Sequence, residues 1–155
     1  FTRPTPVYED SRMIEKINVL VDLAHLYNFP VIYIQHSNQS ILKEGTDGFK
    51  LHPSLRRDLG DLSVIKNHGN AFKDTTLQSI LESRGLENLL VTGMVTQGCI
   101  RATSLGGLEL GYQMFLVSGA HSNYNEDAPK IIEKYEEELQ KAGVYLINID
   151  ELAFS

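Results

Sequence analysis

Cys99 is the only cysteine among 155 residues, and it stands where a reactive thiol is expected. It follows the glycine-containing stretch 93–98 and opens a predicted helix. The amino end of a helix carries a positive partial charge, which favours a thiolate, and its free N–H groups can hold an oxyanion. A lone cysteine is also a common structural residue in protein cores. Spacing alone therefore leaves a nucleophile and a core cysteine as open interpretations.

Lys66 is the second residue with catalytic potential, because it ends a predicted strand. A lysine at this place can simply reach water with its long side chain. If it enters a cleft instead, its ammonium would stabilise the Cys99 thiolate. A Cys–His pair with His68 or His121 is an alternative, but no spacing singles out one histidine, so Lys66 is preferred. His36 ends another predicted strand and is a candidate for lining the cleft.

Other site chemistries lack their sequence signatures. The five histidines and one cysteine form neither H-E-x-x-H nor a zinc-type cluster, so we expect no metal. Neither a Walker motif nor G-x-G-x-x-G is present, so no nucleotide cofactor is expected. A single cysteine without C-x-x-C is weak support for a thiol-redox protein.

Helices and strands alternate along the chain, which predicts parallel strands joined by crossover helices. The expected fold is a Rossmann-like, three-layer α/β/α arrangement with a mainly parallel sheet, forming one domain over residues 1–155. Ligands bind at the carboxyl ends of such strands, where Lys66, Cys99 and the stretch 118–121 fall. A strand should precede the first helix, so we expect the sequence to begin just after it. The predicted helices are 11–28, 74–83, 99–110 and 127–143; the predicted strands are 31–35, 62–66, 88–92, 112–117 and 144–149.

Composition narrows the classes of partner. A net charge of −6 disfavours nucleic acid and anionic lipid surfaces. No apolar run reaches the roughly 20 residues of a membrane span, and no signal peptide is recognised at the start. A free thiol suits a reducing compartment, so we expect a cytoplasmic protein. The glycine pair 106–107 inside the helix after Cys99 predicts close packing of that helix on the sheet.

The stretch 93–103, G-M-V-T-Q-G-C-I-R-A-T, resembles the G-x-x-T-x-x-C-V-x-x-T signature of the isochorismatase-like cysteine hydrolases. Further similarity follows in the family's order and spans most of the chain. It is carried by L-H-P-S-L at 51–55, V-I-K at 64–66, N-A-F at 70–72, G-Y at 111–112 and S-G-A at 118–120.

The resemblance implies roles for individual residues. Cys99 would be the nucleophile and Lys66 the lysine of the catalytic triad. The backbone N–H groups of Val95 and Cys99 would form the oxyanion hole, after a cis peptide between Met94 and Val95. The triad's aspartate would lie ahead of Phe1. The family usually has Asp-Ala at the end of the fourth strand, where this chain has Gly119 and alanine.

The resemblance also implies an activity, which is hydrolysis of a C–N bond in a small amide or carbamoyl compound through a thioester, without a cofactor. The metal-binding pattern of the nicotinamidase branch is missing after the strand 31–35. Phe72, Tyr124, His36 and the loop 37–48 are candidates for binding the substrate, although the aromatic residues could equally belong to the core. A homo-oligomer is expected. The alternative is a catalytically inactive domain of this family that serves as a small-molecule binding or scaffold protein.

Overall fold

The computed structural model describes residues 7–38 and 51–149, and its strands form two parallel sheets. β1 (Ile32–His36) pairs with β2 (Leu62–Lys66). β3 (Asn88–Met94), β4 (Gln113–Ser122) and β5 (Tyr145–Ile147) form the second sheet in that order. Within the described part of the chain no ladder joins β1 to β3, so the expected continuous sheet is seen as two. The strand expected before the first helix falls outside the described residues.

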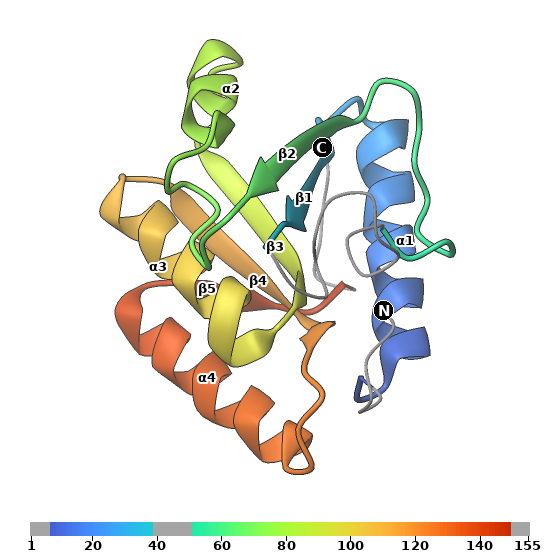
Figure 1. Ribbon diagram of the computed structural model, residues 1–155, viewed down its shortest axis with the longest axis vertical. Helices are drawn as coiled ribbons and strands as arrows, with labels where there is room; N and C mark the ends of the chain where they lie inside the picture. The colour runs from blue at the N-terminus through green and yellow to red at the C-terminus, as the bar shows by residue number, and fades with distance from the viewer. Residues whose placement is uncertain (1–6, 39–50, 150–155) are drawn as a thin grey trace.

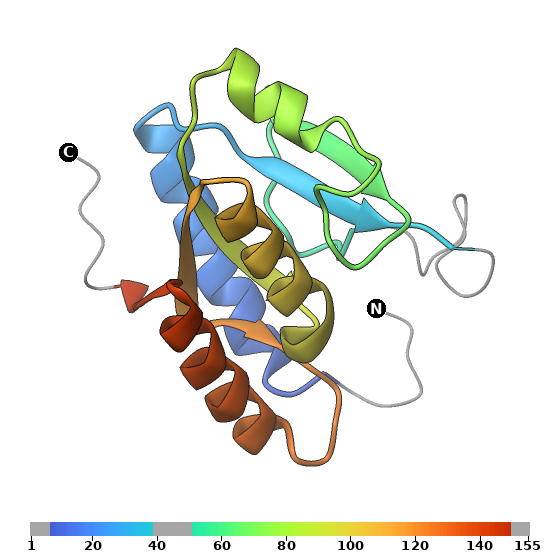
Figure 2. The same cartoon turned by 90° about the vertical axis from the view of Figure 1, so that its left-hand side faces the viewer.

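The helices cover both faces of the strands, which gives the predicted three-layer α/β fold. α1 (Asp10–Leu26) lies on one side of β3 and β4, whereas α3 (Arg101–Glu109) and α4 (Ala128–Ala142) lie on the other (Figure 1). The short helix α2 (Leu77–Ser83) lies along the sheet of β1 and β2 (Figure 2). No helix of the described residues is long and apolar enough to cross a membrane.

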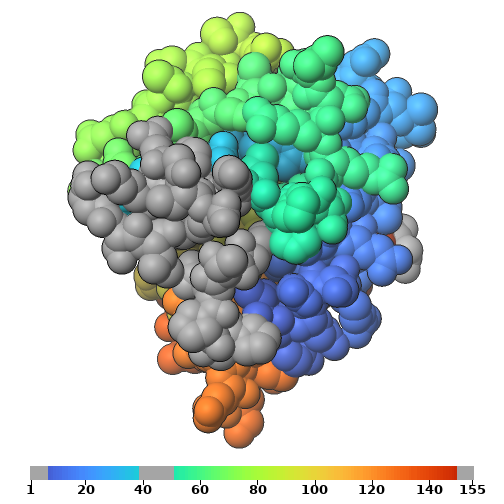
Figure 3. Space-filling model, turned by 45° about the vertical axis from the view of Figure 1, so that its right-hand side comes forward, coloured from blue at the N-terminus to red at the C-terminus, as the bar shows by residue number. Residues whose placement is uncertain are grey.

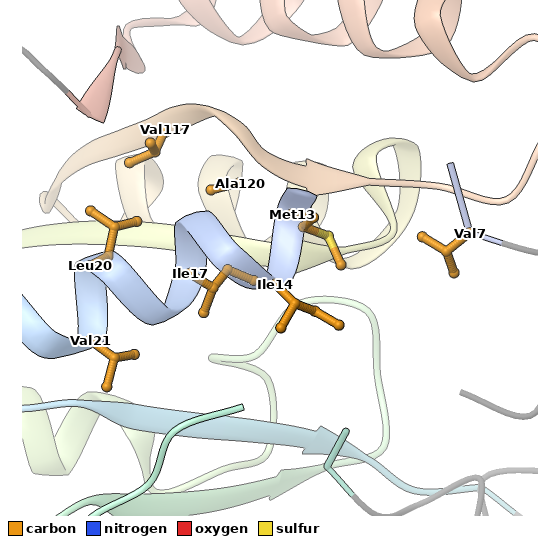
Figure 4. Packing of buried hydrophobic residues seen from close by; sticks show 8 residues of the cluster. All are labelled: Val7, Met13, Ile14, Ile17, Leu20, Val21, Val117 and Ala120. Carbon is orange, nitrogen blue, oxygen red and sulfur yellow. The ribbon is translucent and has the colours of Figure 1, made fainter. Parts of the chain in front are cut away.

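β4 forms the centre of the core because its side chains alternate between the two helical layers. Met114 and Leu116 are buried among residues of α4 and the turn before α3. Val117 and Ala120 are buried against α1. Leu20 of α1 points toward them (Figure 4). This two-sided burial explains why the sequence of β4 is apolar over several consecutive residues.

The glycine pair in α3 has the predicted packing role. A Cβ atom on Gly106 would lie 2.5 Å from the side-chain nitrogen of Asn70. A Cβ atom on Gly107 would overlap the sulfur of Met114 on β4. α3 can therefore lie this close to β4 and to the segment after β2 only because both positions lack a side chain.

Two predicted elements differ from the structure at the place where the chemistry was expected. The helix predicted over 99–110 is two elements, a π-helical turn η1 (Thr96–Ile100) and then α3. The strand predicted over 112–117 continues to Ser122. The pairing of β3 with β4 shifts register between Val91 and Gly93, so that Gly93 pairs with His121 and β4 is extended. The stretch 118–121 is therefore part of β4, not a loop after it. The ends of the other predicted elements agree with the structure to within three residues.

The segment before β2 is tied to the outer side of α1. The side-chain amide of Asn18 donates to the carbonyl of Ser54 (2.8 Å) and accepts from the backbone N–H of Arg56 (2.9 Å). Figure 3 shows this segment, in green, beside α1, in blue. These contacts hold one end of the long connection between β1 and β2 in place.

Candidate active site

The turn that carries Cys99 folds tightly around the carbonyl of Val95. This carbonyl accepts the N–H groups of Gly98 (2.9 Å) and Ile100 (3.2 Å). The peptide bond between Met94 and Val95 is cis, as the resemblance implied. Cys99 is a half-buried free thiol inside the π-turn, and the α-helix begins only after it. The backbone N–H groups predicted for the oxyanion hole therefore belong to one compact turn.

Lys66 is buried at the carboxyl end of β2, so the interpretation in which it reaches water is wrong. Only 4% of the residue is exposed. Its Nζ donates to the carbonyls of His68 (3.1 Å) and Gly69 (2.8 Å). A buried ammonium must be hydrogen-bonded, and these carbonyls satisfy two of its three N–H groups.

The loop that binds the Lys66 ammonium is docked on the first turn of α3. The carbonyl of Gly69 also accepts a hydrogen bond from the Thr103 hydroxyl (3.3 Å), whose oxygen accepts the N–H of Ala71 (3.0 Å). Thr103 follows Cys99 by four residues, close to one helical turn. One carbonyl thus links the ammonium of Lys66 to the helix that continues from the Cys99 turn.

The surroundings of Lys66 are electropositive. Within the described residues, no carboxylate forms an ion pair with it. His36 is its register partner on β1. The pKa of His36 is lowered, first by burial and then by the positive charges of Lys66 and His68. His36 is therefore neutral at pH 7, and its buried Nδ1 has no hydrogen-bond partner among residues 7–38 and 51–149.

His121 lies inside β4, beyond residue 117, where the sequence predicts that this strand ends. Its Nδ1 is 2.9 Å from the Thr96 hydroxyl, and its Nε2 is 2.8 Å from a carboxylate oxygen of Glu136 on α4. Both ring nitrogens are occupied, so His121 is a poor candidate for the base of a Cys–His pair. The His68 ring is paired with Asp74 (3.2 Å). The link from Thr96 to Glu136 had no sequence signal, because it depends on the extra length of β4.

The other predicted binding residues are spread over the molecule. Phe72 packs beneath α2 and stacks on Tyr112 (5.6 Å between ring centroids). The Tyr112 N–H donates to the carbonyl of Gly107 near the end of α3, so the Phe72 ring stacks on a residue beyond that end of the helix. Tyr124 packs at the edge of the α1 cluster. Most of the predicted loop 37–48, from residue 39 onward, lies outside the described part of the chain.

The glycine that replaces the family's aspartate at the end of β4 has a visible physical reason. Gly119 has a φ of 83°, in the left-handed region that favours glycine. A Cβ atom there would overlap the amine of Lys16 on α1. The lysine side chain of α1 thus occupies the space that a side chain at position 119 would need.

Together these features define an α/β protein with a cysteine turn and a buried lysine at the carboxyl ends of its strands. No group of three or more His, Cys, Asp or Glu residues in the described ranges could hold a metal ion. The Isochorismatase domain model matches residues 2–148, and the chain belongs to this family.

Two of the relatives are hydrolases by name. The chain is 27% identical over 121 residues to the streptothricin hydrolase of Streptomyces noursei, which is 77% of this chain and 44% of that protein. It is 33% identical over 75 residues to the ureidoacrylate amidohydrolase RutB of Methylorubrum extorquens, which is 48% of this chain and 30% of that protein. The chain spans about half the length of the curated relatives it matches.

Solved structures share the fold. The crystal structure of a cysteine hydrolase from Pseudomonas syringae superposes with a TM-score of 0.87 at 18% identity. The match covers 97% of this chain and 84% of that one. At this identity the match shows the three-layer fold alone.

Proposed function

We propose that the protein hydrolyses a C–N bond in a small amide or carbamoyl compound through a thioester on Cys99. The observation that carries this proposal is the buried Lys66 ammonium, whose loop is tied through Gly69 to the helix that follows Cys99. We propose that this cation faces the Cys99 thiol across the site, because a cation beside a thiol would favour the thiolate, which is the nucleophilic form.

The proposed reaction has two stages. The Cys99 thiolate attacks the substrate carbonyl, and the backbone N–H groups of Val95 and Cys99 stabilise the oxyanion that forms. The C–N bond then breaks, and the amine leaves with a proton. In the second stage, water attacks the thioester, the C–S bond breaks, and the acid and the free thiol are released. In the balance of the first stage, the proton that the Cys99 thiol gives up is matched by the proton with which the amine leaves.

The relatives support an amide-type substrate. The amidohydrolase and the streptothricin hydrolase are both hydrolases of the same family. The neutral His36 beside Lys66 adds a buried nitrogen without a hydrogen-bond partner among the described residues, suited to a hydrogen bond with a polar substrate group. Substrate binding by His36, Tyr124 and Phe72 stays a prediction. A homo-oligomer and a cytoplasmic location stay predictions.

A screen of small amides, ureas and carbamates tests the proposal, with release of amine or ammonia as the signal. Replacing the nucleophile in Cys99→Ala should reduce the rate by roughly 10³-fold or more. Thermal unfolding monitored by circular dichroism checks that the variant is folded. Hydrolysis that persists in folded Cys99→Ala would exclude the covalent mechanism. Binding of such compounds without turnover would favour the alternative of an inactive binding protein.

A further inference from the structure

A buried chain of hydrogen bonds connects α4 to the first residue of the Cys99 turn. It runs from Glu136 through His121 to the hydroxyl of Thr96, with distances of 2.8 Å and 2.9 Å. The His121 side chain is 0% exposed, and that of Glu136 is 15% exposed. Polar groups this deeply buried are costly unless every partner is in place, so the chain can hold only a few arrangements.

The carboxylate fixes the direction of the first hydrogen bond. A carboxylate can only accept, so Nε2 of His121 carries the hydrogen and donates to Glu136. Nδ1 of the same ring is then held at the Thr96 hydroxyl, which can accept or donate as the ring requires. The orientation of the Thr96 side chain is therefore set by a carboxylate on another helix.

Thr96 matters because it begins the turn that contains the nucleophile. Its carbonyl accepts the N–H of Arg101, the first residue of α3. Arg101 is itself bound to Glu138 on α4, through its Nε (2.9 Å) and an Nη atom (2.7 Å). α4 thus holds the turn before and after Cys99, once through a buried chain and once through a partly exposed ion pair.

We propose that His121 and Glu136 are positioning residues that fix the Cys99 turn through Thr96. The inference rests on the proposed function of Cys99. It adds two residues that lie outside the stretch 93–103, which contains Cys99. Neither residue touches the thiol in this account. Their effect is to keep the turn in the one geometry that presents Cys99 and the two oxyanion N–H groups together.

The rate of Cys99 alkylation by iodoacetamide tests the inference without any substrate. Glu136→Gln removes the charge at nearly constant shape, and Glu137→Gln is its matched control, because Glu137 pairs with Lys141 on the surface. We expect Glu136→Gln to slow alkylation at pH 7 by about three- to tenfold and Glu137→Gln to leave it within twofold. Both variants should melt within a few degrees of the wild type.

A second pair of variants tests the link at Thr96. Thr96→Val removes the hydroxyl that bonds His121, whereas Thr96→Ser keeps it. We expect a loss of about tenfold in the alkylation rate for the valine variant and rescue by the serine variant. With a substrate in hand, Glu136→Gln should lower kcat while KM stays within twofold, since it changes the turn and not the binding groups.

The outcomes separate this inference from the proposed function. Unchanged alkylation in folded Glu136→Gln, or an equal loss in Glu137→Gln, would overturn the positioning role whatever the activity. Hydrolysis that survives Cys99→Ala would overturn the proposed function, even if Glu136→Gln alters the thiol. If Thr96→Val does not fold, Glu136→Gln decides the question alone.

Discussion

The two ends of the parallel strands differ in what they offer a ligand. The amino ends of β3 and β4 border an open hollow of about 460 Å³, lined by residues such as Glu82, Leu86 and Gln113. The carboxyl ends carry the half-buried Cys99 and the buried Lys66. The amino end has a concave surface, whereas the carboxyl end has the candidate nucleophile Cys99, the Lys66 cation and the backbone N–H groups of the Cys99 turn. A hollow alone therefore does not mark the proposed site.

The charge at the carboxyl end gives the largest expected effect. Lys66→Met keeps the length of the side chain and removes its ammonium. We expect kcat/KM to fall by about 10- to 100-fold, since the thiolate loses its stabilising cation. Lys73→Met is the control, because Lys73 is an exposed lysine of the same region. Equal activity of the two variants would mean that Lys66 has only a structural role.

The contact between α3 and the loop after β2 gives the next effect. Gly106→Ala would push a Cβ atom against the Asn70 side chain, close to the loop that binds Lys66. We expect a loss of about 1–3 kcal/mol in unfolding free energy, with a severalfold lower alkylation rate of Cys99. Gly60→Ala is the control, since nothing lies within 4 Å of a Cβ there. A stable Gly106→Ala variant would contradict the close packing.

The pH dependence of the unfolding free energy should come from His25 of α1, which pairs with Asp58 and Asp61 before β2. The hydrogen bond to Asp61 raises the pKa of His25, and the charges of Asp61, Asp58 and Asp22 add to it against the opposing effect of burial. Folding thus favours the protonated form, so this stabilisation is full below pH 6.5 and is lost as the pH rises through the folded-state pKa.

Urea unfolding of the wild type and His25→Gln at pH 5.5 and pH 8 measures this effect. The variant should be less stable than the wild type at the lower pH, and the difference should shrink at the higher pH. A difference that grows with pH would contradict the raised pKa. Because His25 is tied to the segment before β2 and not to Cys99, the alkylation rate should not follow this change.

The smallest effect is expected at the amino-end hollow. Gln113→Ala changes its lining without touching any residue of the Cys99 turn. Hydrolysis and thiol alkylation should both stay within twofold of the wild type. A large loss of activity would mean that the substrate binds at the amino ends of the strands and not beside Cys99.

The sequence predicts the fold because helical and strand periodicities alternate and because glycines mark the element ends. It also predicts Lys66 and Cys99 as candidates, since Lys66 ends a strand and Cys99 lies where the next strand passes into a helix. The prediction fails where the structure depends on pairing between residues far apart in the sequence. The bulge after Val91 extends β4 and buries His121, and local propensity at Ser118 and Gly119 favours a turn instead. The link from Thr96 to Glu136 depends on that extension, so no spacing within the chain indicates it.

The most direct test of the account is the alkylation rate of Cys99 near pH 7, measured in the wild type, in Lys66→Met and against a free cysteine peptide. We expect wild-type Cys99 to react about tenfold faster than the peptide. Lys66→Met should remove this advantage, and Lys73→Met should not. A wild-type rate equal to that of the peptide, unchanged by Lys66→Met, would contradict an activated Cys99.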